Sequence, residues 1–200
     1  LMVGGSDDDV ATVWPVLEAL SPGGGRGLTH VGPPGAGHFT KMVHNGVEYG
    51  MMQAFAEGYA ILSASELGID VEGAMRSWQH GSVVRSWLLD LFVRALEQHP
   101  DLADVAPTAK DSGEGRWTVQ EAVRLGVAAP VISASLFARF VSQDETDVAM
   151  RAISALRNQF GGHDIERLDR VEPEEAVDPA HPTESPGAAP APLDPPGGDA

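Results

Sequence analysis

The chain of 200 residues contains no cysteine and only 13 basic residues against 29 acidic ones. Without cysteine there is no disulfide, thiolate metal ligand or cysteine nucleophile, which fits a reducing compartment such as the cytoplasm. The net charge of −16 leaves no cation cluster for a polyphosphate, so we expect no nucleic-acid partner. We expect no membrane partner either, because no apolar run approaches roughly 20 residues, and we expect no signal peptide, because the opening LMVGGSDDD lacks a basic n-region.

Residues 1–34 predict a strand, a helix and a second strand. LMVGG reads as a short strand, Ser6 followed by three aspartates as a capped helix start, and LTHVG as the second strand. The helix should run to about Leu20, kinked or restarted at Pro15. Because the chain starts at Leu1 instead of a methionine, we interpret this region as the last part of an α/β sheet whose earlier strands are missing.

The region after Gly35 is predicted to be helical. No proline occurs up to Leu67, which indicates one long helix stopped by Gly68. Gly46, Gly50 and Gly58 interrupt it. Each weakens a helix by about 0.8–1 kcal/mol relative to alanine, so we expect another helix or a ligand to approach closely at these positions. Helical spacing of apolar residues recurs in 71–79, 83–98, 118–126, 130–142 and 145–162. The fold class is therefore mainly α, with an all-helical domain over residues 35–165.

Two local signals mark further boundaries. Thr118 with Glu121 has the pattern of a capping box, and Gly126 that of a helix stop. Residues 166–200 form a tail rich in proline, glycine, alanine and acids, without lysine or arginine from Val171 onward. This composition predicts disorder.

Lys41, His44, Asn45 and Glu48 share one face of the long helix, at offsets of 0, 3, 4 and 7. Charged residues at such a spacing usually form a solvated face. Here their neighbours are apolar, so we expect the helix to be central and these side chains to be buried, lining a cavity or paired with one another. A buried lysine can act as a base and a nearby carboxylic acid as a proton donor.

The segment GAGHFTKMVHNGVEYGMMQAFAEGYAIL resembles the signature helix of the decarboxylating 6-phosphogluconate dehydrogenases. The likeness extends from LMVGG through GSVVRSWLLDL, DSGEGRWTVQEAVRLGVAAPVI and LFARF to FGGH, and is greatest for the shorter bacterial branch. It implies that residues 1–34 end a Rossmann-like NAD(P)-binding domain and that 35–165 form a substrate-binding and dimerisation domain. The implied reaction is oxidative decarboxylation of 6-phospho-D-gluconate to ribulose 5-phosphate and CO2 in the pentose phosphate pathway. The implied cofactor is NAD or NADP, with a lean to NAD, and the implied assembly is a homodimer or higher homo-oligomer.

The resemblance also implies roles for residues of the long helix. Lys41 matches the general base that takes a proton from the 3-hydroxyl of the substrate. Glu48 matches the general acid that protonates carbon 1 of the enediol. His44 and Asn45 match residues that bind the substrate's carboxylate and hydroxyls, and Tyr49 matches a contact to its phosphate.

Cationic side chains elsewhere complete the implied substrate site. Arg139 matches a phosphate ligand, and without the resemblance it could equally be an ordinary surface charge. Arg157 and His163 match a pair that the dimer partner inserts into the neighbouring site. Read alone, Arg157 lies in the last turns of a helix capped by Gly161 and Gly162.

This sequence departs from the family pattern in the loop before Trp117. Longer members present a lysine and a threonine to the phosphate where this chain has Ser112 and Glu114. A glutamate would repel a phosphate, so either Arg116 or another cation compensates or the loop lies differently, and we leave both residues out of the site. The loop could also be a solvated turn with Trp117 packed in the core.

A larger departure is that no GxGxxG motif occurs, so we assign no cofactor-binding residue to the chain, and no metal ligand. We therefore expect these 200 residues alone to reduce neither NAD nor NADP. Two alternatives remain. One is another β-hydroxyacid dehydrogenase, which would share Lys41 and Asn45 but not His44 with Glu48. The other is a non-catalytic helical dimerisation module.

Overall fold

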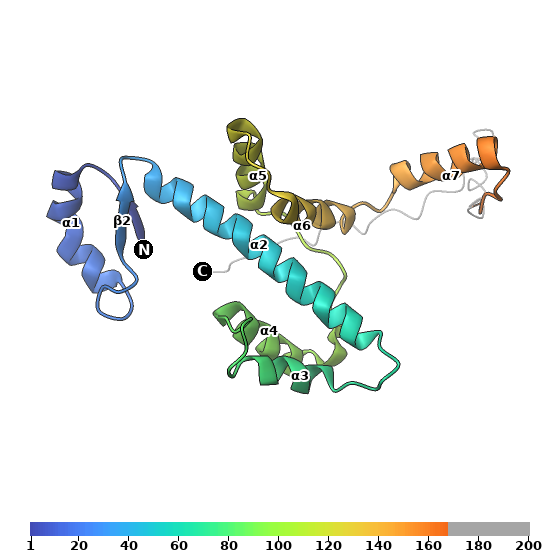
Figure 1. Cartoon of the computed structure of the whole chain (residues 1–200), viewed down its shortest axis with the longest axis horizontal. Coiled ribbons are helices and arrows are strands. Elements are labelled where there is room, and N and C mark those ends of the chain that lie inside the picture. Colours follow the sequence, from blue (N-terminus) through green and yellow to red (C-terminus); the bar gives the residue numbers. More distant parts are fainter. Residues whose placement is uncertain (168–200) are drawn as a thin grey trace, which may run out of the picture. The chain divides into compact units, whose positions relative to one another are not determined.

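The computed structural model describes residues 1–167, shown as coloured ribbons in Figure 1. All but the first two residues of the predicted disordered tail, 166–200, lie outside this range. The chain divides into two compact units, Leu1–Val148 and Ala149–Ala200, and each is described by itself.

The first unit opens with the predicted strand, helix and strand. β1 (Met2–Gly4) pairs in parallel with β2 (Thr29–Gly32), and α1 (Asp7–Leu20) connects them. The Ser6 side chain caps α1 by accepting the Asp9 N–H at 3.3 Å, as the sequence indicated. Pro15 lies inside α1, which continues past it as one helix, so the predicted restart is wrong.

The long helix is α2 (Ala36–Ser63), which follows directly from β2 through a turn at Gly35 with a φ of 96°. It ends before the predicted stop: the Ala64 N–H closes the last turn on the Ala60 carbonyl, and Gly68, with a φ of 63°, lies in the loop beyond. Although α2 is long and rich in apolar residues, no helix within residues 1–167 combines the length and hydropathy needed to cross a membrane.

Every further segment predicted to be helical contains a helix, which confirms the mainly α fold class. Three of them begin elsewhere than predicted, and the last of these starts at Val148 instead of residue 145. The fourth helix starts only at Trp87, because Ser86 caps it by accepting the Leu89 N–H at 3.1 Å, and the fifth starts already at Glu114. The bounds are α3 (Val71–Trp78), α4 (Trp87–Gln98), the short 3-10 helix η1 (Pro100–Leu102), α5 (Glu114–Leu125), α6 (Pro130–Val141) and α7 (Val148–Gly161).

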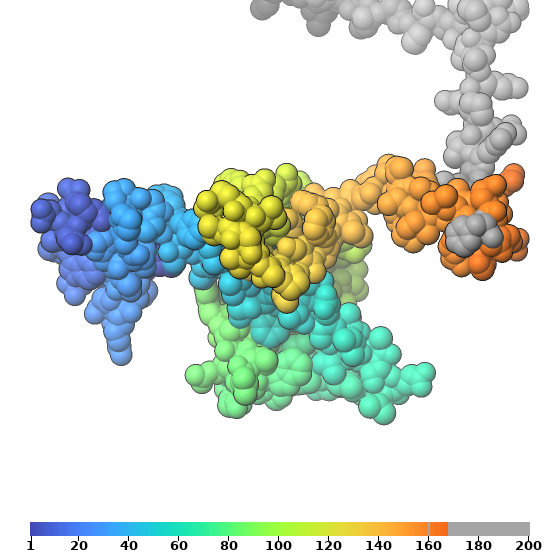
Figure 2. Space-filling model, turned by 45° about the horizontal axis from the view of Figure 1, so that its top comes forward, coloured from blue at the N-terminus to red at the C-terminus, as the bar shows by residue number. Residues whose placement is uncertain are grey.

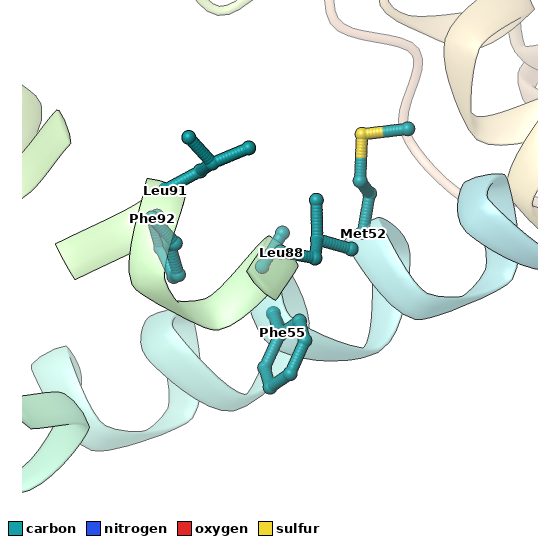
Figure 3. A pocket seen from close by; sticks show the side chains of 6 residues that line it. Met52, Phe55, Leu88, Leu91 and Phe92 are labelled. Carbon is teal, nitrogen blue, oxygen red and sulfur yellow. The ribbon is translucent and has the colours of Figure 1, made fainter. Parts of the chain in front are cut away.

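α2 is the central element of the first unit, and helices pack against it on two sides (Figures 1 and 2). The helices α3 and α4 form the main cluster of buried apolar side chains in the unit, and the C-terminal half of α2 packs against this cluster. Between α2 and α4 lies an apolar pocket of about 290 Å³ (Figure 3). The buried core residues are Met75, Leu89, Val93 and Leu96, and α2 adds Phe55, Tyr59 and Leu62.

On its other side α2 is crossed by α5, and the crossing is at Gly46. A methyl group added to Gly46 would lie 2.6 Å from Cγ2 of Thr118, which leaves no room for any side chain but hydrogen. Thr118 is 5% exposed, and its hydroxyl lies 2.8 Å from the Met42 carbonyl of α2 and 2.9 Å from the Glu114 carbonyl within α5. The predicted capping box at Thr118 is therefore wrong, because this threonine is an interior residue of α5 that joins the two helices.

Gly50 and Gly58, the other two glycines expected to mark a close approach to the long helix, differ from each other. A methyl group on Gly50 would lie 3.2 Å from Cγ1 of Val131 in α6, so α6 approaches closely there, as predicted. A methyl group on Gly58 would meet no atom of the described residues within 4 Å, so the expected close approach is absent there within this part of the chain. Gly46 and Gly58 therefore form a matched pair, in one helix, for testing the crossing.

We predict that Gly46→Ala lowers the free energy of unfolding by about 1–3 kcal/mol, because it forces α2 and α5 apart. Gly58→Ala should raise it by about 0.5–1 kcal/mol, because alanine favours the helix and nothing obstructs its methyl group. Urea denaturation of the two variants beside the parent chain measures both changes. Equal effects of the two substitutions would show that the close approach at Gly46 has no energetic weight.

Candidate active site

The predicted polar stripe exists on α2, and its members contact one another. The Lys41 ammonium donates a hydrogen bond to Oδ1 of the Asn45 side chain. Nδ1 of His44 lies 3.4 Å from Lys41 Nζ, 3.0 Å from Asn45 Oδ1 and 4.0 Å from Glu48 Oε2. The four side chains thus form one continuous polar row, as their spacing indicated.

The predicted burial of this stripe is wrong for the part of the chain that the structure describes. Lys41 is exposed, and the side chains of His44 and Glu48 are 57% and 43% exposed. The reason is the arrangement around α2: α5 crosses at Gly46 on an adjacent face, and α3 and α4 pack further along the helix. An exposed polar row is open to a ligand from solvent.

The stripe borders two hollows of the surface. One, of about 330 Å³, places His44 and Glu48 beside the apolar side chains Met51, Trp87 and Leu91. The other, of about 410 Å³, is lined by Lys41 and His38 together with the first residues of the chain and Gly37. Proton donors and acceptors of the row therefore face concave surface at both ends.

Tyr49 follows the stripe by one residue and is 4% exposed. Its hydroxyl donates to Asp111 Oδ1 at 3.1 Å, accepts the Ser112 N–H at 3.1 Å and lies 3.0 Å from Ser112 Oγ. A methyl group on Gly115 would lie 2.4 Å from the Tyr49 ring, so only glycine fits there. The ring and the loop before α5 are thus locked together.

Arg139 of α6 covers the Tyr49 ring, with its guanidinium carbon 3.5 Å from the ring centroid. It donates to the Lys110 carbonyl at 3.0 Å and points a second nitrogen at the Met52 sulfur, 3.8 Å away. The structure therefore brings two of the predicted phosphate-binding residues, Tyr49 and Arg139, into direct contact. This cation–π stacking is stronger than that of an exposed arginine because the ring beneath it is buried.

Asp111 was not singled out from the sequence, although it is the most connected carboxylate of the region. Its side chain is 5% exposed and accepts the Gly113 N–H at 3.0 Å and Arg116 Nε at 2.9 Å, besides the Tyr49 hydroxyl. Burial alone would raise the pKa of Asp111, but these donors outweigh it and hold the pKa of the carboxyl below its usual value. Arg116 also lies over the Phe140 ring, 5.1 Å from its centroid.

The departing residues Ser112 and Glu114 are bound to each other. The Ser112 hydroxyl donates to Glu114 Oε2 at 2.6 Å, which lowers the pKa of Glu114, and the positive charge of Lys41 lowers it further. Glu114 is thus an anion within electrostatic reach of the stripe. Trp117 is 52% exposed, so the alternative in which it packs in the core is wrong: it lies on the outer face of the first turns of α5.

Arg157 and His163 belong to the second unit. Arg157 is an exposed residue of α7, and His163 follows the end of that helix. The helix ends as predicted: Gly162 has a φ of 64°, and its N–H bonds to the Asn158 carbonyl at 3.0 Å. Asn158 also donates to the His163 carbonyl at 2.9 Å, so the residues around the helix end form one local turn.

The β1–α1 corner does not fit a dinucleotide. A pyrophosphate needs free backbone N–H groups and no negative charge at a helix start. Here the first turn of α1 carries Asp7, Asp8 and Asp9, and the capping position Ser6 is engaged with Asp9. We assign no cofactor-binding residue to this corner.

Comparison with known proteins identifies the family of the chain. Residues 37–153 match the model of the 6-phosphogluconate dehydrogenase C-terminal domain. The chain is 42% identical over 170 residues to the NAD(+)-dependent, decarboxylating 6-phosphogluconate dehydrogenase of Haloferax volcanii, covering 84% of this chain and 56% of the relative. It is equally similar to the protein YqeC of Bacillus subtilis, 42% over 168 residues, covering 83% of this chain and 55% of that protein.

A solved structure of the Plasmodium falciparum 6-phosphogluconate dehydrogenase superposes with a TM-score of 0.63 at 30% identity, covering 85% of this chain and 37% of that one. Its title describes an apo form and complexes with the cofactor NADP+ and the substrate 6-phosphogluconate. The chain spans little more than half the length of the curated relatives above. By its residues 37–153, which include the whole polar stripe and the Tyr49 cluster, the chain belongs to the 6-phosphogluconate dehydrogenase family.

Proposed function

We propose that this chain carries the proton-transfer and substrate-binding residues for the oxidative decarboxylation of 6-phospho-D-gluconate to ribulose 5-phosphate and CO2. The observation that carries the proposal is the continuous row from Lys41 to Glu48, with the Tyr49–Arg139 stack beside it. An amine, an imidazole, an amide and a carboxylate in one line can bind a polyhydroxy acid and exchange protons with it.

In this proposal Lys41 is the base that accepts the proton of the 3-hydroxyl. A nicotinamide cofactor, NAD or NADP, supplies the hydride acceptor when bound, and no residue of the β1–α1 corner holds it. Asn45 accepts a hydrogen bond from Lys41 and keeps the amine directed along the stripe. His44, whose Nδ1 lies between the amine and the Glu48 carboxylate, contacts the substrate's carboxylate and hydroxyls.

In the later steps Lys41 acts as a proton donor instead of a base, and Glu48 supplies a second proton. Protonated Lys41 donates to the new carbonyl at carbon 3, which stabilises the negative charge that develops as CO2 leaves carbon 2. Glu48 then gives a proton to carbon 1 of the resulting enediol. Arg139, held on the Tyr49 ring, binds the phosphate at the other end, since a guanidinium presents the planar fork that suits phosphate oxygens.

We further propose that residues 35–165 act as the substrate and dimerisation domain, that residues 1–34 belong to a Rossmann-like domain, and that the working unit is a homodimer or higher homo-oligomer. Apolar side chains flanking the stripe support the assembly: Val43, Val47 and Met51 are 36–49% exposed. In such an assembly Arg157 and His163 of the partner copy would complete the phosphate site.

The proton chemistry is testable without hydride transfer. Removing a proton from carbon 1 of ribulose 5-phosphate needs a base at the Glu48 position and a cation at the carbonyl, but no cofactor. We therefore predict that the chain exchanges this hydrogen with deuterium in D2O, and that Glu48→Gln and Lys41→Met each slow the exchange at least about 100-fold. Proton NMR of carbon 1 measures the rate.

Glu57→Gln provides the matched control. Glu57 lies on the same helix and, within residues 1–167, bonds to Gln53 alone, at 2.9 Å, so its substitution should leave the exchange rate unchanged. Exchange that proceeds equally in all the variants, or at the rate of buffer alone, would contradict the assignment of Lys41 and Glu48.

A second prediction concerns the overall reaction. The isolated 200 residues should reduce neither NAD nor NADP in the presence of 6-phosphogluconate, because their sequence has no GxGxxG motif and the start of α1 is acidic. Absorbance of the reduced nicotinamide measures the turnover. Formation of NADH or NADPH by the purified chain would contradict the absence of a cofactor site.

A further inference from the structure

The Tyr49 hydroxyl has one proton to give, and two acceptors compete for it. These are the carboxylate oxygen Oδ1 of Asp111 at 3.1 Å and the hydroxyl oxygen of Ser112 at 3.0 Å. A carboxylate is the stronger acceptor, because a hydrogen bond to a charged oxygen is roughly twice as strong as one to a neutral oxygen. The proton therefore goes to Asp111, and the phenol oxygen is left to accept the Ser112 N–H.

Asp111 is built into the fold as a fixed acceptor. Its side chain is 5% exposed, and its three donors come from α2, from the turn and from α5: Tyr49, Gly113 and Arg116. A buried carboxylate with this many donors stays ionised and has no freedom to rotate away. It thereby fixes both the direction of the Tyr49 hydroxyl and the course of the 111–113 turn.

We propose that Asp111 is a positioning residue for phosphate binding: by holding the Tyr49 hydroxyl it fixes the 111–113 turn and the Tyr49–Arg139 stack in the geometry that receives the phosphate of the substrate. The inference rests on the proposed function, because it assumes that the Tyr49–Arg139 end binds that phosphate. Asp111 acts through Tyr49 and does not itself touch the substrate, since its carboxylate is buried and would repel an anion.

The test is a double-mutant cycle on selectivity. The dissociation constants of 6-phosphogluconate and of gluconate are measured for the 200-residue chain by calorimetry, and their ratio isolates the phosphate. Asp111→Asn and Tyr49→Phe should each reduce the ratio about tenfold, by loss of one charge-assisted hydrogen bond. The double variant should also lose about tenfold, because both changes break the same contact.

Asp104→Asn is the matched control. Asp104 also accepts a hydrogen bond from a neighbouring side chain, His99, at 2.8 Å, but that side chain is exposed and lies outside the Tyr49 cluster. It should leave the ratio unchanged, alone and combined with Tyr49→Phe. A hundredfold loss in the Asp111→Asn/Tyr49→Phe variant would overturn the inference, because additive effects mean that Asp111 acts independently of Tyr49.

Two further outcomes are decisive. If the parent chain binds 6-phosphogluconate no more tightly than gluconate, both the proposed function and this inference are overturned. If the parent chain prefers the phosphorylated acid and Asp111→Asn keeps that preference, the inference is overturned and the proposed function stands. If Asp111→Asn does not fold, Arg116→Gln takes its place: it leaves both bonds of Oδ1 intact, so the ratio should change by less than about twofold. A tenfold loss in that variant would place the effect in the ion pair and overturn the role assigned to Tyr49.

Discussion

The close crossing of α5 over α2 at Gly46 is the contact on which the rest of the site depends. Because Gly46 has no side chain, Thr118 can sit against the α2 backbone and hydrogen-bond to the Met42 carbonyl. The first turn of α5 then lies beside the polar stripe, which brings Gly115 under the Tyr49 ring. The polar stripe and the Tyr49 cluster are therefore registered to each other by one steric contact and one hydrogen bond.

The exposure of the stripe sets a condition on its chemistry. An amine in contact with bulk water is hydrated, and this water has to be displaced before a substrate hydroxyl can reach the amine. The first unit leaves the stripe open, since Lys41 is exposed and His44 and Glu48 are about half exposed. The substrate, together with another surface that covers the apolar flank at Val47 and Met51, has to exclude water before Lys41 can act as a base.

The sequence was sufficient where a signal is local. Ser6 caps α1 and Gly126 ends α5 with a φ of 68°, because capping depends only on adjacent residues. The capping box at Thr118 failed because its hydroxyl has a tertiary partner, and no local pattern reports the crossing of another helix. Burial of the stripe failed for a related reason: apolar neighbours show that α2 is central but not which of its faces are covered. The presence of the helices and the mainly α fold class could be predicted from the helical spacing of apolar residues alone.

The sequence around Asp111 contains a local turn signal that the sequence analysis did not use. An aspartate two residues before a glycine is typical of a turn in which the carboxylate accepts the glycine N–H, and Asp111 makes that bond with Gly113. The local pattern thus indicated the turn. It did not indicate the contacts of Asp111 with Tyr49, 62 residues earlier in α2, and with Arg116 in α5. The roles of the site residues themselves came from the family likeness, because spacing alone does not distinguish a solvated face from a reactive one.

The spacing of the two clusters on α2 favours a long substrate over a short one. From Lys41 to Tyr49 the helix rises roughly 12 Å, at 1.5 Å per residue. That is about the length of an extended six-carbon acid with a phosphate at its far end. A three- or four-carbon β-hydroxyacid bound at the Lys41–Asn45 pair would leave the Tyr49–Arg139 stack without a ligand. The spacing therefore supports the proposed phosphorylated sugar acid over the smaller hydroxyacids on which a related helix could act.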